Sequence, residues 1–302
     1  MTGLTRWIRR GVERSPPFIR FAVGWQTVQR GGGDNEAMSV PPRPHNFHRY
    51  VAIGDSFTEG MSDEHPDRAG VYVGWADRLA DRLARDAAAT GEEFGYANLA
   101  VRGRLLADIA GPQVDAAREL APDLVSIVGG GNDLLRGRVD VDALADLLEQ
   151  AVARLSSAGA RVVLTTPVDP VAAPLLGRAR GRYATYAAHT WSIARRHDAV
   201  VVDLWGVRAL RDARLWAPDR IHMTTEGHRR VAASAYTALG FSADEDWTAP
   251  LPPAPQIPRT HRVVAHARWA RHHLAPWVGR RVRGASAGDS ITAKRPAVLP
   301  LD

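Results

Sequence analysis

Short apolar runs alternate with longer segments of helical periodicity through most of this 302-residue chain. The longer segments repeat apolar residues three and four positions apart, which is the spacing of one helix face. Five strands are predicted, at Tyr50–Ile53, Tyr96–Val101, Leu124–Val128, Val162–Thr165 and Val200–Leu204. Four helices are predicted, at Trp75–Ala89, Val141–Leu155, Ala172–Arg196 and Glu226–Leu239. Such alternation is typical of an α/β domain.

The order of these elements predicts a doubly wound parallel sheet. Parallel neighbours need crossover connections, which are almost always right-handed. Ligands of such sheets bind beyond the carboxyl ends of the strands. We therefore expect the functional residues to lie where the predicted strands end.

Both ends of the chain lie outside this pattern. Residues 1–46 are predicted to be a basic arm and a linker rich in Gly and Pro, and residues 47–245 to be the α/β domain. Residues 246–302 are predicted to be a proline-rich connector and a basic tail. The arm is expected to be either a separate element or an upstream extension of a chain that starts at Met38.

One segment of the basic tail, about Arg259 to His273, has helical periodicity. A narrow apolar stripe runs along it, formed by Val263, Ala267, Ala270 and Leu274. So narrow a stripe is too weak for strong membrane insertion. We therefore expect this helix to dock on the main domain, with Trp269 and Trp277 adding packing area, rather than to bind an anionic membrane surface.

Charge and composition exclude several classes of protein. The net charge is +6, but the basic excess lies at the two ends, so no nucleic-acid groove is expected on the main domain. The absence of cysteine excludes disulfides, thiolate catalysis and cysteine metal ligands. Neither a signal peptide nor a membrane-spanning run is evident, so a soluble, cytoplasmic protein is expected.

Three serines lie in short sequences found in hydrolases: Ser56, Ser286 and Ser290. The G-x-S-x-G motif around Ser286 makes a nucleophile only when a strand precedes it and a His follows it. Neither condition is met there, so Ser286 and its neighbour Ser290 are predicted to be loop residues. Ser56 closes Gly54-Asp55-Ser56 directly after the first predicted strand and is the predicted nucleophile.

The chain also offers partners for a serine nucleophile. Asp219 and His222 lie three residues apart, and a neutral imidazole oriented by a carboxylate can take the serine proton. An oxyanion needs donors, and other strand ends supply the backbone N–H of Gly103 and the side-chain amide of Asn132. The triple glycine before Asn132, which includes Gly130, does not match a phosphate-binding loop.

In order and context, four blocks resemble those of the SGNH (GDSL-type) hydrolases: Gly54-Asp55-Ser56, Asn98-Leu99-Ala100-Val101-Arg102-Gly103, Gly130-Gly131-Asn132-Asp133 and Asp219-Arg220-Ile221-His222. The resemblance covers roughly Arg49 to Gly240, and Phe57 stands where many members have Leu. It implies a flavodoxin-like three-layer α/β/α fold with a five-stranded parallel sheet, no metal or other cofactor, and hydrolysis of acyl esters of small molecules, lipids or carbohydrates.

The resemblance also implies a role for each motif residue. Ser56 would be the nucleophile, His222 the base and then the acid, and Asp219 the orienting carboxylate of an acyl-enzyme mechanism. The oxyanion hole would consist of the backbone N–H groups of Ser56 and Gly103 and the amide of Asn132. The turns would be held by Gly54, Asp55 and Gly130.

Two other functions stay open at this point. One is a catalytically inert binding module on the same fold, although the full set of motif residues disfavours it. The other is a metal-dependent hydrolase that uses Asp219, His222 and His228, because carboxylate and imidazole suit zinc. The metal hypothesis leaves Ser56 and Asn132 without a role.

Overall fold

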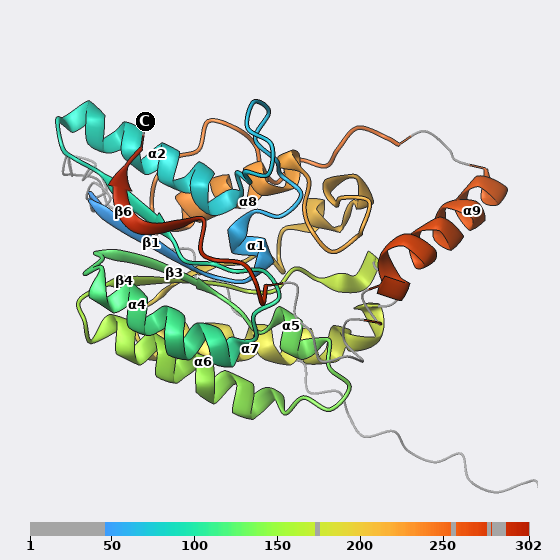
Figure 1. Ribbon diagram of the computed structural model, residues 1–302, viewed down its shortest axis with the longest axis horizontal. Coiled ribbons are helices and arrows are strands. Elements are labelled where there is room, and N and C mark those ends of the chain that lie inside the picture. Colours follow the sequence, from blue (N-terminus) through green and yellow to red (C-terminus); the bar gives the residue numbers. More distant parts are fainter. Residues whose placement is uncertain (1–45, 173–175, 255–257, 277–278, 280–287, 302) are drawn as a thin grey trace, which may run out of the picture. The chain divides into compact units, whose positions relative to one another are not determined.

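The fold was derived from a computed structural model, shown in Figure 1. The structure describes residues 46–172, 176–254, 258–276, 279 and 288–301. Chain contacts divide the protein into Met1–Arg43 and Pro44–Asp302, and all described residues belong to the second unit. Residues 1–45 of the predicted arm and linker, which include Met38, lie outside the described residues, as do Trp277 and Ser286.

Strands and helices alternate along most of the described chain. Its described residues form six strands, β1 (Arg49–Gly54), β2 (Gly95–Asn98), β3 (Leu124–Val128), β4 (Arg161–Thr165), β5 (Val200–Val202) and β6 (Arg295–Pro300). The α-helices in the same part of the chain are α1 (Ser56–Glu59), α2 (Trp75–Thr90), α3 (Leu106–Asp108), α4 (Val114–Glu119), α5 (Gly131–Leu134), α6 (Val141–Ser156), α7 (Arg180–Arg196), α8 (Thr225–Ala238) and α9 (Arg259–Trp269). Two π-helical turns follow α3 and α9, η1 (Ile109–Gln113) and η6 (Ala270–Leu274).

The described strands form one sheet in the order β5-β4-β3-β1-β2-β6. Strands β1 to β5 run parallel to one another. Their order, 2-1-3-4-5, is that of flavodoxin-like domains, so the predicted fold class is confirmed. In this topology the strand order reverses between β1 and β3, and ligands bind beyond the carboxyl ends of those two strands.

The tail contributes a strand that the sequence pattern did not predict. The sheet of the described residues has six strands, so the expected number of five was wrong. Strand β6 pairs antiparallel with β2, with Leu299 opposite Tyr96. It contains Pro296 and Pro300, which cannot donate to a strand ladder and are tolerated at an edge. Figure 1 shows β6 at the edge of the sheet. The end of residues 246–302 therefore completes the sheet.

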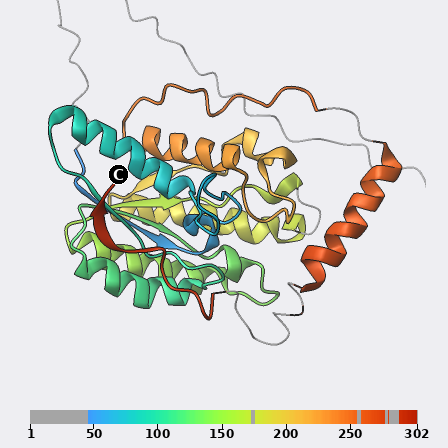
Figure 2. The ribbon, with the colours of Figure 1, turned by 45° about the horizontal axis from the view of Figure 1, so that its top comes forward.

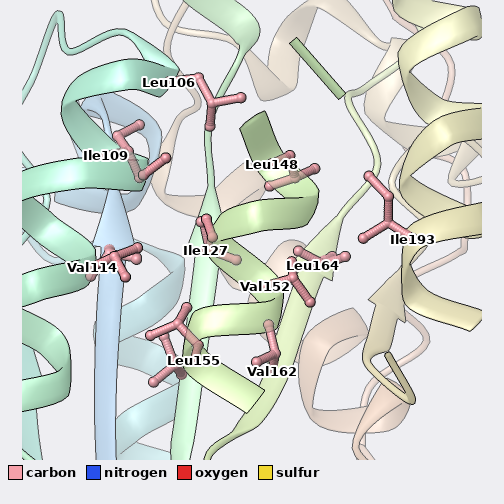
Figure 3. Close-up of a cluster of buried hydrophobic side chains, with 14 of the residues drawn as sticks. Leu106, Ile109, Val114, Ile127, Leu148, Val152, Leu155, Val162, Leu164 and Ile193 are labelled. Atoms are coloured by element: carbon pink, nitrogen blue, oxygen red, sulfur yellow. The ribbon is translucent and has the colours of Figure 1, made fainter. Parts of the chain in front are cut away.

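Helices cover both faces of the sheet (Figures 1 and 2). Side chains alternate along β1, so that Val51 and Ile53 join one apolar cluster and Tyr50 and Ala52 join the other. The first cluster packs beneath η1, α4, α6 and α7, and Figure 3 shows part of it. The second packs beneath α2 and α8. This arrangement is the three-layer α/β/α fold.

Three predicted elements have clearly different ends in the structure, and one of them is β5, which stops at Val202 rather than at Leu204. Strand β2 stops at Asn98 because this side chain turns the backbone, accepting a hydrogen bond from the Ala100 N–H at 3.1 Å and donating one to the Thr58 carbonyl at 3.0 Å. The helix predicted over 172–196 begins at Arg180, after short 3-10 turns.

A helical segment over 106–119 was not predicted. Elements α3, η1 and α4 follow one another there without a break, and Pro112 lies inside η1. Proline lacks the N–H that a regular helix needs, and the backbone accommodates it in a wider π turn. The adjacent Gly111 and Pro112 had hidden the helical pattern.

Candidate active site

The chain turns sharply at the carboxyl end of β1. Gly54 has φ +157°, and a Cβ atom at this position would lie 2.6 Å from Thr58 Oγ1, so only glycine fits. The carboxylate of Asp55 caps α1 by accepting a hydrogen bond from the Phe57 N–H at 3.0 Å. Ser56 is the first residue of α1, where the helix itself provides no acceptor for the backbone N–H.

Ser56, His222 and Asp219 form one hydrogen-bonded chain. His222 Nε2 lies 3.0 Å from Ser56 Oγ, and His222 Nδ1 lies 2.6 Å from Asp219 Oδ2. An ionised carboxylate can only accept, so the ring proton is assigned to Nδ1 and Nε2 can accept from the serine hydroxyl. The predicted motif residues of two distant segments therefore meet in the fold.

Hydrogen bonds keep Asp219 ionised. Burial alone would raise the pKa of Asp219. The His222 ring and the backbone N–H groups of Ile221 and His222, both 3.0 Å from Oδ1, outweigh burial and lower the pKa to about 2. The carboxylate is therefore charged at neutral pH and can stabilise a protonated imidazole.

The loop that carries Asp219 and His222 has a strained backbone. Arg220 has φ +63°, in the left-handed region that costs a non-glycine residue about 1 kcal/mol. This turn directs the next two N–H groups at the carboxylate. A hydrogen bond of 2.8 Å from the Ala217 N–H to the His222 carbonyl closes the loop.

Asn132 lies beside the turn at the end of β1. It belongs to α5, which begins after Gly130 at φ +90°, where a Cβ atom would lie 2.8 Å from Tyr186 Oη. The Asn132 amide donates to Asp55 Oδ2 at 3.2 Å and to the Arg104 carbonyl at 3.0 Å. Burial raises the pKa of Asp55, the acceptor of the first bond, to about 6.

Gln113 supports the same turn and was missed by the sequence analysis. Its side chain accepts from the Gly54 N–H at 2.8 Å and donates to the Gly54 carbonyl at 2.9 Å. Both polar groups of a buried glycine are thereby satisfied. Gln113 lies in η1, where no motif or periodic pattern marked it.

A partly buried ion pair ties α1 to the loop before Gly103. Glu59 accepts from the Arg102 backbone N–H at 2.7 Å and from Arg102 Nε at 2.9 Å. The Arg102 guanidinium also lies over the Tyr72 ring, 5.1 Å from its centroid. The helix that begins at Ser56 is thus joined to the segment expected to supply an oxyanion donor.

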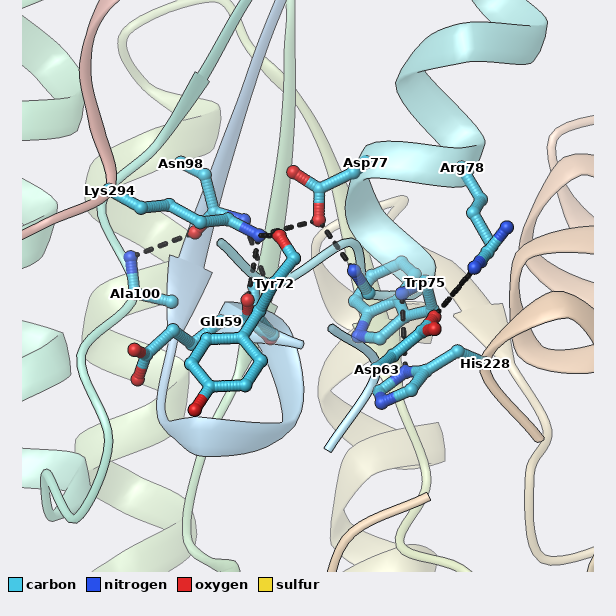
Figure 4. Close-up of polar contacts among 12 residues, drawn as sticks. Glu59, Asp63, Tyr72, Trp75, Asp77, Arg78, Asn98, Ala100, His228 and Lys294 are labelled. Carbon is cyan, nitrogen blue, oxygen red and sulfur yellow. Dashed lines mark hydrogen bonds and ion pairs between the residues drawn. The ribbon is translucent and has the colours of Figure 1, made fainter. Parts of the chain in front are cut away.

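Lys294 joins the C-terminal segment to α1 (Figure 4). Its Nζ donates to the Glu59 carbonyl at 2.6 Å, to the Tyr72 carbonyl at 2.9 Å and to Asp77 Oδ2 at 2.6 Å. All three ammonium protons therefore have an acceptor. The only signal in the sequence was that Lys294 is the single lysine of the chain.

His228 holds two helices together, and the metal hypothesis was wrong. Its Nδ1 accepts from the Trp75 N–H at 3.2 Å (Figure 4). Its Nε2 faces the Met61 carbonyl at 3.4 Å. Burial lowers the pKa of His228, which keeps the ring neutral. Among the described residues, no three His, Asp or Glu side chains form a cluster that could hold a metal ion.

A cleft of about 1570 Å³ opens above the hydrogen-bonded chain. Its lining includes Ser56, Asn132, Asp219 and His222, together with mostly apolar side chains. Ser290 lies outside this lining and is exposed, at the end of the turn at 288–290.

Gly103 is an expected oxyanion donor that the structure does not place in the cleft wall. It has φ +75°, on the loop after β2, and within the described chain it is not part of the lining. A Cβ atom on Gly288 would lie 2.1 Å from the Arg102 carbonyl oxygen. The C-terminal segment therefore packs closely against the loop that contains Gly103.

Helix α9 contacts the loop of Asp219, through a face other than the predicted stripe. Trp269 Nε1 donates to the Asp219 carbonyl at 2.8 Å, and Arg220 Nη1 lies 2.8 Å from His266 Nδ1. The face that meets the loop carries the large, half-buried Trp269 ring, whereas Ala267 of the predicted stripe is exposed. No helix among the described residues, α9 included, is long and apolar enough to span a membrane.

Comparisons with known proteins identify the fold and the family. The acetylxylan esterase Axe2 from Geobacillus stearothermophilus has a TM-score of 0.53 and 21% identity, covering 66% of this chain and 97% of that chain. LAE5, an α/β hydrolase enzyme from the metagenome of Lake Arreo, Spain, has a TM-score of 0.53 and 23% identity, covering 64% and 95%. No curated protein sequence matches the chain. The model of the GDSL-like lipase/acylhydrolase family matches residues 52–230, more than half of the chain. The chain therefore belongs to this family and is a carboxylic ester hydrolase.

Proposed function

We propose that the protein cleaves acyl esters through a covalent acyl-enzyme intermediate on Ser56. The observation that carries this proposal is the hydrogen-bonded chain from Ser56 Oγ through His222 to Asp219, with separations of 3.0 and 2.6 Å. A serine hydroxyl is a weak nucleophile until a neutral imidazole removes its proton. His222 Nε2 has the position and the tautomer that this step needs.

In the acylation step, Ser56 Oγ attacks the ester carbonyl carbon and its proton moves to His222 Nε2. The tetrahedral intermediate then breaks the bond to the alkoxy oxygen, which takes the proton from His222 and leaves as the alcohol. In the second step His222 removes a proton from water, whose oxygen attacks the acyl carbon. The carboxylic acid leaves as the proton returns to Ser56 Oγ, while Asp219 stabilises the imidazolium in both steps.

We assign the oxyanion hole to the backbone N–H groups of Ser56 and Gly103 and to the Asn132 amide. The start of α1 supports the first donor, and the position of Asn132 in the cleft wall supports the third. Before substrate binds, the Asn132 amide bonds to Asp55 and Arg104. The bond to Asp55, the longer one at 3.2 Å, is the one that an oxyanion would replace. Gly103 is included on the family motif alone.

The test compares Ser56→Ala with Ser290→Ala, since each substitution removes one hydroxyl. With 4-nitrophenyl butyrate as substrate, Ser56→Ala should lower kcat/KM by about 10⁴-fold or more, and Ser290→Ala should match the wild type. A fluorophosphonate should add one group to the wild-type protein, on the peptide that contains Ser56. Full activity of Ser56→Ala, or an adduct on another serine, contradicts the proposal.

A further inference from the structure

One wall of the cleft comes from a helix that the family match does not include. The match ends at residue 230, whereas α9 begins at Arg259. The α9 and η6 residues in the cleft lining recur three and four positions apart and include His261, Val264, Ala265, Arg268, Trp269 and His272. One face of α9 therefore belongs to the active-site cleft. The charged residue on this face is Arg268, which is basic.

The acidic side chains of the cleft are already engaged. Three carboxylates line it, those of Asp55, Asp169 and Asp219. Asp169 is paired with Arg180 at 2.7 Å and with Arg211 at 2.9 Å. The other two accept the hydrogen bonds described above. None of the three carboxylates is therefore available to bind a cationic substrate.

Two arginines of the lining have no carboxylate partner among the described residues, Arg220 and Arg268. The Arg220 guanidinium lies over Trp269, 4.8 Å from the ring centroid, and uses one of its five N–H donors for His266 Nδ1. Stacking fixes the plane of a guanidinium and leaves its edge for planar acceptors. Arg268 precedes Trp269 in α9 and is exposed. The cleft therefore presents two cations beside the loop that carries His222.

We propose that Arg220 and Arg268 bind an anionic group, a phosphate or a carboxylate, that the ester substrate carries in addition to its acyl bond. This inference rests on the proposed function, because it names the class of ester that the same site accepts. Guanidinium groups bind both anions through paired hydrogen bonds. The apolar part of the wall, which includes Leu135, Val168 and Tyr183, suits the acyl chain. A neutral ester leaves the two cations without a counter-charge.

Two matched pairs of water-soluble esters test the proposal and locate the anion. The acyl-side pair is 4-nitrophenyl hexanoate and the mono-4-nitrophenyl ester of adipate, which share the leaving group and the acyl length. The alcohol-side pair is 1-butyrylglycerol and its 3-phosphate. All four are used below the concentrations at which they aggregate, so that no lipid surface takes part. The wild type should prefer the anionic member of at least one pair in kcat/KM by about tenfold.

The same preference should depend on Arg268. In Arg268→Gln the ratio of kcat/KM for the anionic over the neutral ester should fall severalfold. Arg271→Gln is the matched control, because Arg271 is an exposed residue of η6 outside the cleft lining, and it should keep the wild-type ratio. No preference for either anionic ester in the wild type, or a ratio unchanged in Arg268→Gln, overturns the proposal.

A binding measurement separates this proposal from the proposed function. Titration calorimetry on Ser56→Ala with hexyl phosphate should show binding that hexanol does not show and that weakens when Arg268→Gln is added. Anion binding combined with ester hydrolysis that survives Ser56→Ala would refute the nucleophile and keep the anion site. Loss of hydrolysis in Ser56→Ala without anion binding would keep Ser56 as the nucleophile and refute the anion site.

Discussion

Lys294 Nζ lies 2.6 Å from the carbonyl oxygen of Glu59, at the end of the short helix that begins at Ser56. The contact joins the C-terminal segment to the helix that carries Ser56, and its two residues are 235 positions apart in the chain. The same ammonium group bonds to the Asp77 carboxylate, which also accepts from the Gly74 N–H at the start of α2. We therefore infer that the C-terminal segment helps to hold the turn at Ser56 in place.

Lys294→Met should destabilise the protein. The substitution leaves Asp77 and two carbonyl groups without their common donor, and loss of one partner from a largely buried pair costs about 3 kcal/mol. Urea unfolding should show a lower midpoint and a similar slope. Arg118→Met, which removes an exposed cation from α4, should leave the midpoint in place. An unchanged midpoint in Lys294→Met contradicts the positioning role.

Asp219→Asn should lower kcat by about 10⁴-fold with little change in KM. Two backbone N–H groups bond to Oδ1, so the oxygen of the new amide will occupy that place and its NH₂ will face His222 Nδ1. Nδ1 must then accept, which puts the ring proton on Nε2, where the serine proton should go. Steady-state kinetics with Asp212→Asn as the control, a carboxylate bound to Arg214, will show whether the effect is specific. A KM effect alone would mean that Asp219 serves binding.

Asn132→Ala should lower kcat by about 10²- to 10³-fold, the usual effect of removing one oxyanion donor. KM should change little, because this donor acts on charge that develops in the transition state. Kinetics on 4-nitrophenyl butyrate provide the measurement, and Asn46→Ala, which removes an exposed amide bound to Glu92, provides the control. If only KM rises, the amide binds the substrate and not the oxyanion.

Asp55→Asn should stabilise the protein more at pH 8 than at pH 4. Burial raises the pKa of Asp55 from its ordinary 3.8 to about 6, so the folded protein binds this proton more tightly than the unfolded chain does. The contribution of protonated Asp55 to the free energy of unfolding is complete below pH 3.8 and is lost as the pH rises through about 6. Above that pH the ionised group costs up to about 3 kcal/mol, a cost that the amide avoids.

Urea unfolding of the wild type and Asp55→Asn at both pH values provides the measurement. Asp67→Asn, a change at an exposed position, should show no such dependence. Equal stabilisation by Asp55→Asn at pH 4 and pH 8 would show that Asp55 titrates normally.

The residues that we propose as catalytic could be selected from the sequence because local sequence marks them. Ser56 and Asn132 follow strands whose apolar runs are plain, and Asp219 and His222 lie together in one loop. The residues that hold these side chains in place could not be predicted in this way. Gln113 bonds to a residue 59 positions away, and only the folded backbone brings the two together.

The tail shows the same limit. Its apolar stripe predicted a helix correctly, but the face that meets the domain is chosen by Trp269 and by the position of the Asp219 carbonyl. Strand β6 was missed because Pro296 and Pro300 argue against a strand anywhere but at a sheet edge. Which segment forms the edge depends on the whole topology.

The engagement of Lys294 has a consequence for the chemistry of the protein surface. Because this is the only lysine, the exposed side-chain cations of the described chain at alkaline pH are guanidinium groups. Guanidinium does not release its proton below pH 12, so the surface keeps its positive charge at alkaline pH, where lysine-rich proteins lose theirs. The single side-chain amine is partly buried and bonded to three acceptors. The rate at which an acylating reagent modifies it therefore reports how often the C-terminal segment separates from α1.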